Sequence, residues 1–215
     1  IMIAFVLGLS WALRTYVFTA YEIPSGSMEE TIMTGDMEFA EKVSYYFRDP
    51  QPGDIVTFSD PEIPGRTLIK RCIATAGQTI DIDGDGFLYI DGVAQTETYT
   101  HGKPTLPLTN STITFPYTVP SGYIWVMGDN RTNSQDSRYF GAVPASSVTG
   151  RGVLVYWPVP DFGLLEKGRV ARLFSSRQAR TSGIRQGEPC QPKPSPRTRQ
   201  RDVPAPSRPR SRTSS

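Results

Sequence analysis

The stretch that decides the fold class runs from residue 54 to residue 92 and reads DIVTFSDPEIPGRTLIKRCIATAGQTIDIDGDGFLYIDG. Its apolar residues come in the short groups DIVTF, TLIKRCIA, TIDI and FLYI, which turn residues such as Asp83-Gly84 and Asp91-Gly92 separate. Short groups rich in β-branched and aromatic residues, bounded by such turns, are typical of strands. This stretch therefore predicts a series of short antiparallel strands.

The same pattern continues further along the chain, in YIWVMGD at 123–129 and GRGVLVYW at 150–157. Between 95 and 120 the chain is rich in Thr, Pro and Ser with little periodicity, which indicates loops. The 215 residues include 19 Gly and 19 Pro, a composition that argues against a helical bundle. We expect a mainly β fold with an antiparallel core at 21–165 and a smaller inserted subdomain of hairpins and loops at about 78–122.

The chain begins with thirteen uncharged residues, IMIAFVLGLSWAL, before Arg14. As a helix they would cover about 20 Å, whereas the hydrocarbon core of a bilayer needs about 30 Å. Because the sequence opens with Ile1, we expect residues 1–20 to be part of a transmembrane anchor whose upstream half is absent. A signal peptide and a buried amphipathic helix are the alternatives, although a basic start and a small-residue cleavage site are missing before Arg14.

Charge divides the chain into two parts. Residues 167–215 carry 13 basic and 2 acidic side chains, and the residues before them carry 10 basic and 19 acidic ones. Pro, Ser and Arg dominate the final part, which cannot bury enough apolar surface to offset the entropy of ordering. We expect residues 166–215 to be a disordered basic tail, either simply solvated or touching anionic lipid or wall polymer.

The metal-binding side chains are few and scattered. Cys72 lies in an apolar run and Cys190 in the tail, so neither a disulfide framework nor, with His101 as the only histidine, a zinc site is indicated. The acidic residues around Asp83 resemble the start of a calcium loop, but Gly92 stands where its glutamate ligand would be. We expect a hairpin turn there, and no metal or organic cofactor.

Residues 21–36, YEIPSGSMEETIMTGD, contain a candidate nucleophile. Pro24 restricts the backbone and Gly26 permits a sharp bend that could project Ser27 outward. The alternative is a helix start, in which Ser27 is the N-cap and Glu30 completes a capping box.

Lys70 is a candidate base for that serine. Strand alternation places Leu68, Lys70, Cys72 and Ala74 on one face, where desolvation favours the neutral amine. Its pKa must fall about three units from 10.4 to leave the amine substantially neutral near pH 7. The alternative is a lysine at a sheet edge with its ammonium group in water, and His101 is a second candidate base in a loop without a fixed orientation.

A third segment, VMGDNRTNSQDSRYFG at 126–141, places hydroxyl, carboxylate and guanidinium groups within five residues. An ion pair between Asp136 and Arg138 could fix this loop, and Ser134 could hydrogen-bond a nearby amine.

Together these segments resemble the bacterial type I signal peptidases, membrane-bound serine proteases with a Ser/Lys dyad. The resemblance rests on PSGSM at 24–28, GDIVTF at 53–58, LIKR at 68–71 and GDNRTNSQDSRYFG at 128–141, in the family's order after an apolar start. It covers roughly residues 11–165. The tail matches no family pattern.

The resemblance implies that Ser27 is the nucleophile and Lys70 the general base. Ser25 and the Ser27 N–H would bind the oxyanion, and Ser134 would hydrogen-bond Lys70. Its other supporting residues are Asp129, Asn130, Asp136 and Arg138. The residues that it places in shallow apolar pockets, which accept small side chains one and three positions before the cut, are Tyr21, Ile23, Met28, Ile32 and Ile69.

The function implied by the resemblance is cleavage of signal peptides from exported preproteins after Ala-x-Ala-like sites, with neither a cofactor nor a nucleic acid partner. The enzyme would be a single-pass protein of the cytoplasmic membrane, with its catalytic domain touching the bilayer on the extracytoplasmic side. The alternatives are a Ser/Lys peptidase that processes a conjugation pilus protein and a non-catalytic relative that acts as an assembly chaperone.

The sequence departs from the family pattern at two places. Glu30 stands where a proline is usual, which loosens the backbone after the nucleophile and adds charge near the cleft. The usual Gly-x-Pro-Gly-Asp turn after the lysine strand is replaced by ATAGQ at 74–78.

Overall fold

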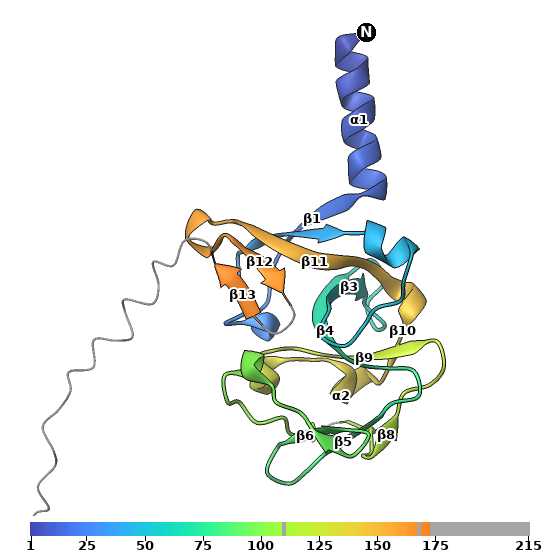
Figure 1. Cartoon of the computed structure of the whole chain (residues 1–215), viewed down its shortest axis with the longest axis vertical. Helices are drawn as coiled ribbons and strands as arrows, with labels where there is room; N and C mark the ends of the chain where they lie inside the picture. Colours follow the sequence, from blue (N-terminus) through green and yellow to red (C-terminus); the bar gives the residue numbers. More distant parts are fainter. Residues whose placement is uncertain (109–110, 167–168, 173–215) are drawn as a thin grey trace, which may run out of the picture. The chain divides into compact units, whose positions relative to one another are not determined.

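The computed structural model describes residues 1–108, 111–166 and 169–172. These residues lie in one compact unit, Ile1–Arg177, and the second unit of the chain, Gln178–Ser215, falls outside them. Antiparallel strands dominate the described part, as Figure 1 shows. The predicted mainly β, antiparallel fold is therefore confirmed.

The N-terminal helix α1 spans Met2–Tyr16, and strand β1 begins at Phe18 (Figure 1). The predicted anchor at 1–20 thus contains a helix and the start of a strand. The change occurs where β-branched and aromatic residues follow one another, which favours extended backbone. Among the described residues, the helices fall short of the length and apolar character that a membrane crossing requires.

The larger sheet contains nine of the strands in the described part of the chain. Along its main path the strand order is β1-β2-β11-β3-β4-β9-β10, and β12 joins β11 while β13 joins β12. Their bounds are β1 Phe18–Glu22, β2 Met37–Glu41, β3 Ile55–Ser59, β4 Thr67–Thr75, β9 Tyr123–Met127, β10 Val143–Pro144, β11 Val148–Trp157, β12 Gly163–Glu166 and β13 Arg169–Arg172.

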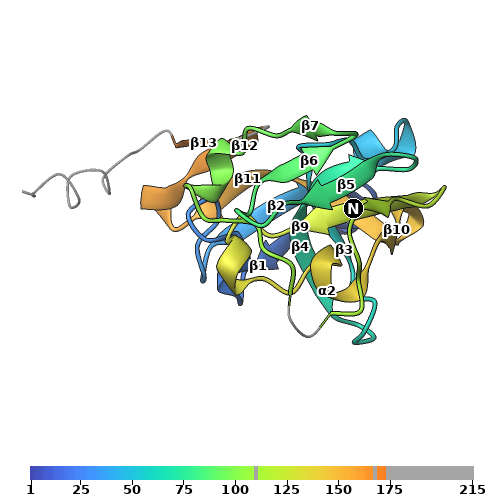
Figure 2. The same ribbon diagram turned by 90° about the horizontal axis from the view of Figure 1, so that it is seen from below.

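A smaller sheet has the order β7-β6-β5-β8 and lies within the range expected for the inserted subdomain. Figure 2 shows β5, β6 and β7 side by side. The bounds are β5 Thr79–Ile82, β6 Leu88–Ile90, β7 Val93–Ala94 and β8 Tyr117–Thr118. The hairpin expected around Asp83 is confirmed, because β5 and β6 pair antiparallel and the Asp83 carboxylate accepts the N–H groups of Asp85 and Phe87.

Short helical segments join the strands. The four-residue helix α2 spans Ser137–Phe140. The 3-10 helices are η1 Gly26–Met28, η2 Val43–Tyr46, η3 Thr98–Thr100, η4 Arg131–Asn133, η5 Ala145–Ser147 and η6 Val159–Asp161.

Buried apolar side chains form three clusters. The first packs β4 and β9 of the large sheet against β5 and β6 of the small sheet, with Trp125 at its centre. The second lies under η1, and the third lies between β3, β4 and β9. Cys72 belongs to the third cluster but Ala74 to the first, because the pairing of β4 with β9 shifts register between them. The predicted common face of β4 therefore ends at Cys72.

The C-terminal tail begins later than expected. Strand β13 pairs antiparallel with β12, so the hairpin continues to residue 172. The sequence pattern missed this strand because its arginines match the composition of the basic tail. The remainder of the predicted tail, 173–215, lies outside the described residues.

Candidate active site

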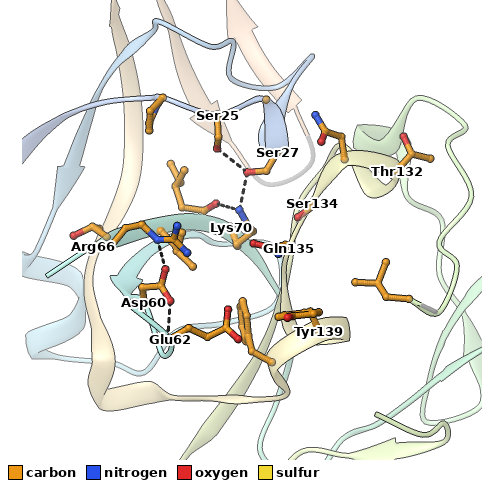
Figure 3. Close-up of a pocket in the computed structure, with 18 residues that line it drawn as sticks. Ser25, Ser27, Asp60, Glu62, Arg66, Lys70, Thr132, Ser134, Gln135 and Tyr139 are labelled. Carbon is orange, nitrogen blue, oxygen red and sulfur yellow. Dashed lines mark hydrogen bonds and ion pairs between the residues drawn. The ribbon is translucent and has the colours of Figure 1, made fainter. Parts of the chain in front are cut away.

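Three segments that are distant in the sequence meet around a cleft of about 610 Å3. They are the turn at η1, the first half of β4 and the loop between β9 and α2. Figure 3 shows Ser25 and Ser27 on one side of Lys70, with Ser134 and Gln135 beside it. The three segments singled out in the sequence are therefore brought together.

Ser27 is the central residue of η1, and its side chain is buried. The turn is fixed on its N-terminal side by the Ile23 N–H, which donates to Asp36 O at 2.9 Å. The alternative capping box is wrong, because Ser25 is the N-cap and no side chain there caps the backbone. Ser25 Oγ instead lies 3.4 Å from Ser27 Oγ.

Lys70 lies in β4, which is paired with β3 on one side. Its side chain is buried, only 3% of the residue is exposed, and Nζ lies 2.6 Å from Ser27 Oγ. A second donor of the amine bonds Ile69 O at 3.0 Å. The alternative of a solvated lysine at a sheet edge is therefore wrong.

The environment of Lys70 favours the neutral amine. Its pKa is lowered from 10.5 to about 8, mainly by burial, and the nearby positive charge of Arg66 acts in the same direction. The carboxylates of Asp136 and Asp129 act in the opposite direction but are outweighed. An amine with this pKa is partly neutral near pH 7 and can accept a proton from the adjacent hydroxyl.

The loop after β9 is fixed by the ion pair expected between Asp136 and Arg138. Two nearly parallel contacts of 2.9 Å join their side chains, and both are buried. Asp136 also accepts the Gly128 N–H at 3.0 Å, and Arg138 donates to Arg131 O at 2.8 Å. The Asp136–Arg138 pair therefore holds the beginning of this loop, at Gly128 and Arg131, against its end.

The same loop is tied to the nucleophile turn and to β4. Asp129 accepts two hydrogen bonds from Arg71, at 2.8 and 2.6 Å, and one from Thr31 Oγ1 at 2.6 Å. Asn130 donates its N–H to Ser27 O at 3.0 Å and its Nδ2 to Gly26 O at 2.8 Å. Both residues thus hold the turn that carries Ser27.

Sequence reasoning missed a buried network behind this loop. The guanidinium of Arg71 lies 4.2 Å from the centre of the Tyr99 ring, and that of Arg131 lies 5.8 Å from it. Arg131 also forms an ion pair with Glu97. The adjacent Lys70-Arg71 pair was the available signal, since a buried arginine requires a carboxylate partner.

Ser134 differs from the expectation. Its Oγ is buried with no hydrogen-bond partner in the described part of the chain, so the expected bond to Lys70 is not formed. The amine donates to Ser27 and Ile69 instead. Ser134 packs tightly against Gly128, where a Cβ would collide with its side chain.

The apolar residues assigned to substrate pockets are mostly buried. Ile69 lines the cleft, and Ile23, Met28 and Ile32 pack with it in the apolar cluster under η1. Tyr21 is outside both groups. The assignment of these five residues to substrate pockets stays a prediction.

His101 is not placed to act on Ser27. Its Nδ1 lies 3.1 Å from a carboxylate oxygen of Glu30, and it does not line the cleft. The alternative base is therefore excluded by geometry.

A buried serine hydroxyl that contacts a buried lysine of lowered pKa, in an open cleft, is the arrangement of serine hydrolases that use lysine as the base. Residues 1–157 match the model of the family described as signal peptidase, peptidase S26. The chain belongs to this family.

Individual relatives agree with this family. A protein of Synechocystis sp. named probable signal peptidase I-1 is 38% identical over 77% of this chain and 83% of that protein. Signal peptidase I of Leptolyngbya laminosa is 36% identical over 73% of this chain and 77% of that protein. A crystal structure of a signal peptidase I from Enterococcus faecalis V583 is 35% identical, covers 48% of this chain and 97% of that chain, and has a TM-score of 0.39.

Proposed function

We propose that this protein is a membrane-bound serine endopeptidase that removes N-terminal signal peptides from exported preproteins after Ala-x-Ala-like sites. The observation that carries the proposal is the 2.6 Å contact between Lys70 Nζ and Ser27 Oγ in a buried position. Family membership supports the choice of substrate class.

Ser27 is the nucleophile and Lys70 the general base in this mechanism. The neutral amine removes the hydroxyl proton while Oγ attacks the scissile carbonyl, and the resulting ammonium then protonates the leaving amine. The Ser27 N–H and the Ser25 hydroxyl stabilise the oxyanion. Lys70 next activates a water molecule that hydrolyses the ester and restores the hydroxyl.

The substrate binds as an added strand along the start of β4. Strand β3 covers one edge of residues 67–71, whereas pairing with β9 begins only at Arg71. The opposite edge of 67–70 is thus open to an extended peptide, whose main chain can supply the missing hydrogen bonds. Ile69 lines the cleft beside Lys70 and provides apolar contact for a small side chain.

The apolar helix α1 is the proposed membrane attachment. Its large apolar side chains, among them Phe5, Leu7 and Trp11, are exposed. We place the catalytic domain on the extracytoplasmic side of the cytoplasmic membrane, in contact with the bilayer. Holding enzyme and preprotein on one surface raises their effective concentration.

The test is cleavage of a preprotein with an Ala-x-Ala site by the full chain in phospholipid vesicles. Ser27→Ala and Lys70→Met should each lower kcat by about a thousandfold or more. The matched controls Ser59→Ala and Lys42→Met, outside the cleft, should cleave at the wild-type rate. The proposal fails if either active-site variant cleaves as fast as its control.

The pH profile tests the role of Lys70 separately. With a lysine pKa of about 8, the neutral fraction, and with it the acylation rate, should rise about tenfold from pH 7 to pH 9. A profile that is flat over this interval would exclude Lys70 as the base.

A further inference from the structure

The peptide unit between Gly26 and Ser27 carries the proposed oxyanion donor. It is a trans unit, so the carbonyl of Gly26 and the N–H of Ser27 point in opposite directions. Whatever fixes the carbonyl therefore fixes the N–H. The Gly26 carbonyl accepts the side-chain amide of Asn130 at 2.8 Å and the N–H of Glu29 at 3.2 Å.

The side-chain amide of Asn130 can donate a hydrogen bond to the Gly26 carbonyl only if its nitrogen, and not its oxygen, faces Gly26. Lys103 makes the shortest contact that favours this orientation, because Nζ lies 3.1 Å from Asn130 Oδ1 and an ammonium group can only donate. Two longer contacts agree with it, from Thr132 Oγ1 to Oδ1 and from Nδ2 to Glu29 Oε2, both at 3.4 Å. Asn130 is nearly buried, so no bulk water competes for this amide.

Lys103 is itself held by a residue of the nucleophile segment. Its Nζ lies 3.6 Å from one carboxylate oxygen of Glu30, and His101 Nδ1 lies 3.1 Å from the other. Glu30 follows Ser27 by three residues and has a φ of 73°, and His101 has a φ of 52°. The loop that contains His101 and Lys103 is thereby joined to the turn at two points.

We propose that Lys103 is a positioning residue for the oxyanion site: it orients the Asn130 amide, which holds the Gly26 carbonyl and so directs the Ser27 N–H into the cleft. This inference rests on the proposed function, because it assigns the Ser27 N–H to the oxyanion. Lys103 belongs to the segment between β7 and β8, so the inserted subdomain contributes to catalysis without contacting substrate.

Removal of the Lys103 ammonium group should lower kcat without weakening substrate binding. Without Lys103 the Asn130 amide oxygen keeps only the longer contact with Thr132, so the amide rotates more readily, and in the rotated state its oxygen opposes the Gly26 carbonyl. An oxyanion donor is worth about a hundredfold to a thousandfold in kcat, so its misorientation should cost less than its complete loss. Substrate binding should be preserved, because Lys103 does not line the cleft.

The experiment measures kcat and KM of Lys103→Met and Lys103→Arg in vesicles, with a fluorogenic peptide containing an Ala-x-Ala site. Lys103→Met should lower kcat about tenfold to a hundredfold and leave KM within about twofold. Lys103→Arg, which keeps a donor, should recover most of the loss. The midpoint of the pH profile should stay unchanged, since the charges that most affect the Lys70 pKa do not include Lys103.

Two controls locate the effect. Lys42→Met removes a lysine whose amine donates to Thr15 O, away from the cleft, and its kcat should equal that of the wild type. His101→Asn removes the contact with Glu30 but keeps the contact between Lys103 and Asn130. Its kcat should therefore fall less than that of Lys103→Met.

Three results would overturn the inference. They are a kcat for Lys103→Met within twofold of wild type, an equal loss in Lys103→Arg, and a shift of the pH midpoint. Ser27→Ala is measured in the same assay to separate the two claims. If Ser27→Ala is inactive, any of these three results refutes only the role of Lys103. If Ser27→Ala is active, the proposed function itself is refuted.

Discussion

Arg71 and Asp129 form a buried, bidentate ion pair whose two contacts measure 2.8 and 2.6 Å. Arg71 follows Lys70 in β4, and Asp129 precedes Asn130 in the loop that holds the nucleophile turn. This one pair therefore fixes the separation between the segment that carries the amine and the segment that carries the hydroxyl.

Loss of the Asp129 charge should be strongly destabilising. Asp129→Asn leaves the Arg71 guanidinium buried without a counter-charge, which typically costs about 3–5 kcal/mol. Urea unfolding at pH 7 measures the change in free energy of unfolding. The exposed Asp49→Asn is the matched control, and its change should stay within about 0.5 kcal/mol. Equal stability of Asp129→Asn and wild type would show that the pair does not hold these segments together.

Gly128 is required by close packing and not by its backbone angles. A Cβ at this position would lie 2.5 Å from Ser27 O and would also collide with the side chain of Ser134. Since a backbone carbonyl cannot move aside without shifting Ser27, Gly128→Ala should displace the hydroxyl from Lys70. We expect at least a tenfold loss of kcat/KM, because small misplacements of reacting groups have large effects.

The control for Gly128→Ala is Gly84→Ala, because a Cβ at Gly84 meets no atom within 4 Å. It should retain the activity of the wild type in the same peptide assay. If Gly128→Ala is equally active, the tight packing around the nucleophile turn has no catalytic importance.

The sequence was sufficient for the strands within 54–92, 123–127 and 150–157 and for the residues of the Ser27–Lys70 pair, but β1, β2 and β13 were not predicted. Alternation in TLIKRCIA predicts the buried amine, since period-two patterning specifies the face on which a side chain lies. The alternation placed Ala74 on the wrong face, because a register shift between β4 and β9 interrupts it after Cys72. Local patterns do not encode such irregularities in strand pairing.

Contacts between segments that are distant along the chain could not be predicted from the sequence. Lys103 and Glu97 lie in a stretch that has no periodicity, and their partners Asn130 and Arg131 are about thirty residues away. The burial of Met28 was likewise not predictable, because the direction of a side chain in a three-residue turn depends on tertiary packing.

Glu30 stands where the family pattern that the sequence resembles has proline, and the structure gives this difference a physical consequence. Its φ of 73° lies in the left-handed region, whereas proline is fixed near −65°. Glu30→Pro should therefore destabilise the protein by about 3 kcal/mol or force the turn to rearrange, with loss of activity. Thermal unfolding and the peptide assay measure both effects.

Glu30→Gly separates backbone geometry from the side-chain contacts, because glycine adopts this φ without strain. It should fold with nearly wild-type stability, in contrast to Glu30→Pro. A stable and fully active Glu30→Pro would mean that residue 30 does not need the left-handed conformation.

Glu38 is the clearest source of pH-dependent stability outside the cleft. Its carboxyl is completely buried, and within the described residues neither oxygen has a hydrogen-bond partner. It lies against Gly152, where a Cβ would collide with it. Burial raises its pKa from 4.5 to about 8, so the carboxyl is protonated in the folded protein at neutral pH.

Between pH 4.5 and about 8 the folded state keeps this proton while the unfolded state has released it, so stability should fall as the pH rises through that window. The slope is at most about 1.4 kcal/mol per pH unit. Lys70 acts in the opposite direction around and above its folded-state pKa of about 8, where the unfolded state still holds a proton that the folded state has lost. Urea unfolding at pH 5, 6 and 7, where Lys70 stays mostly protonated, therefore separates the Glu38 slope from that of Lys70. Glu38→Gln should remove most of the slope, whereas the exposed Glu62→Gln should keep it, and an unchanged slope in Glu38→Gln would show that the buried carboxyl is not its source.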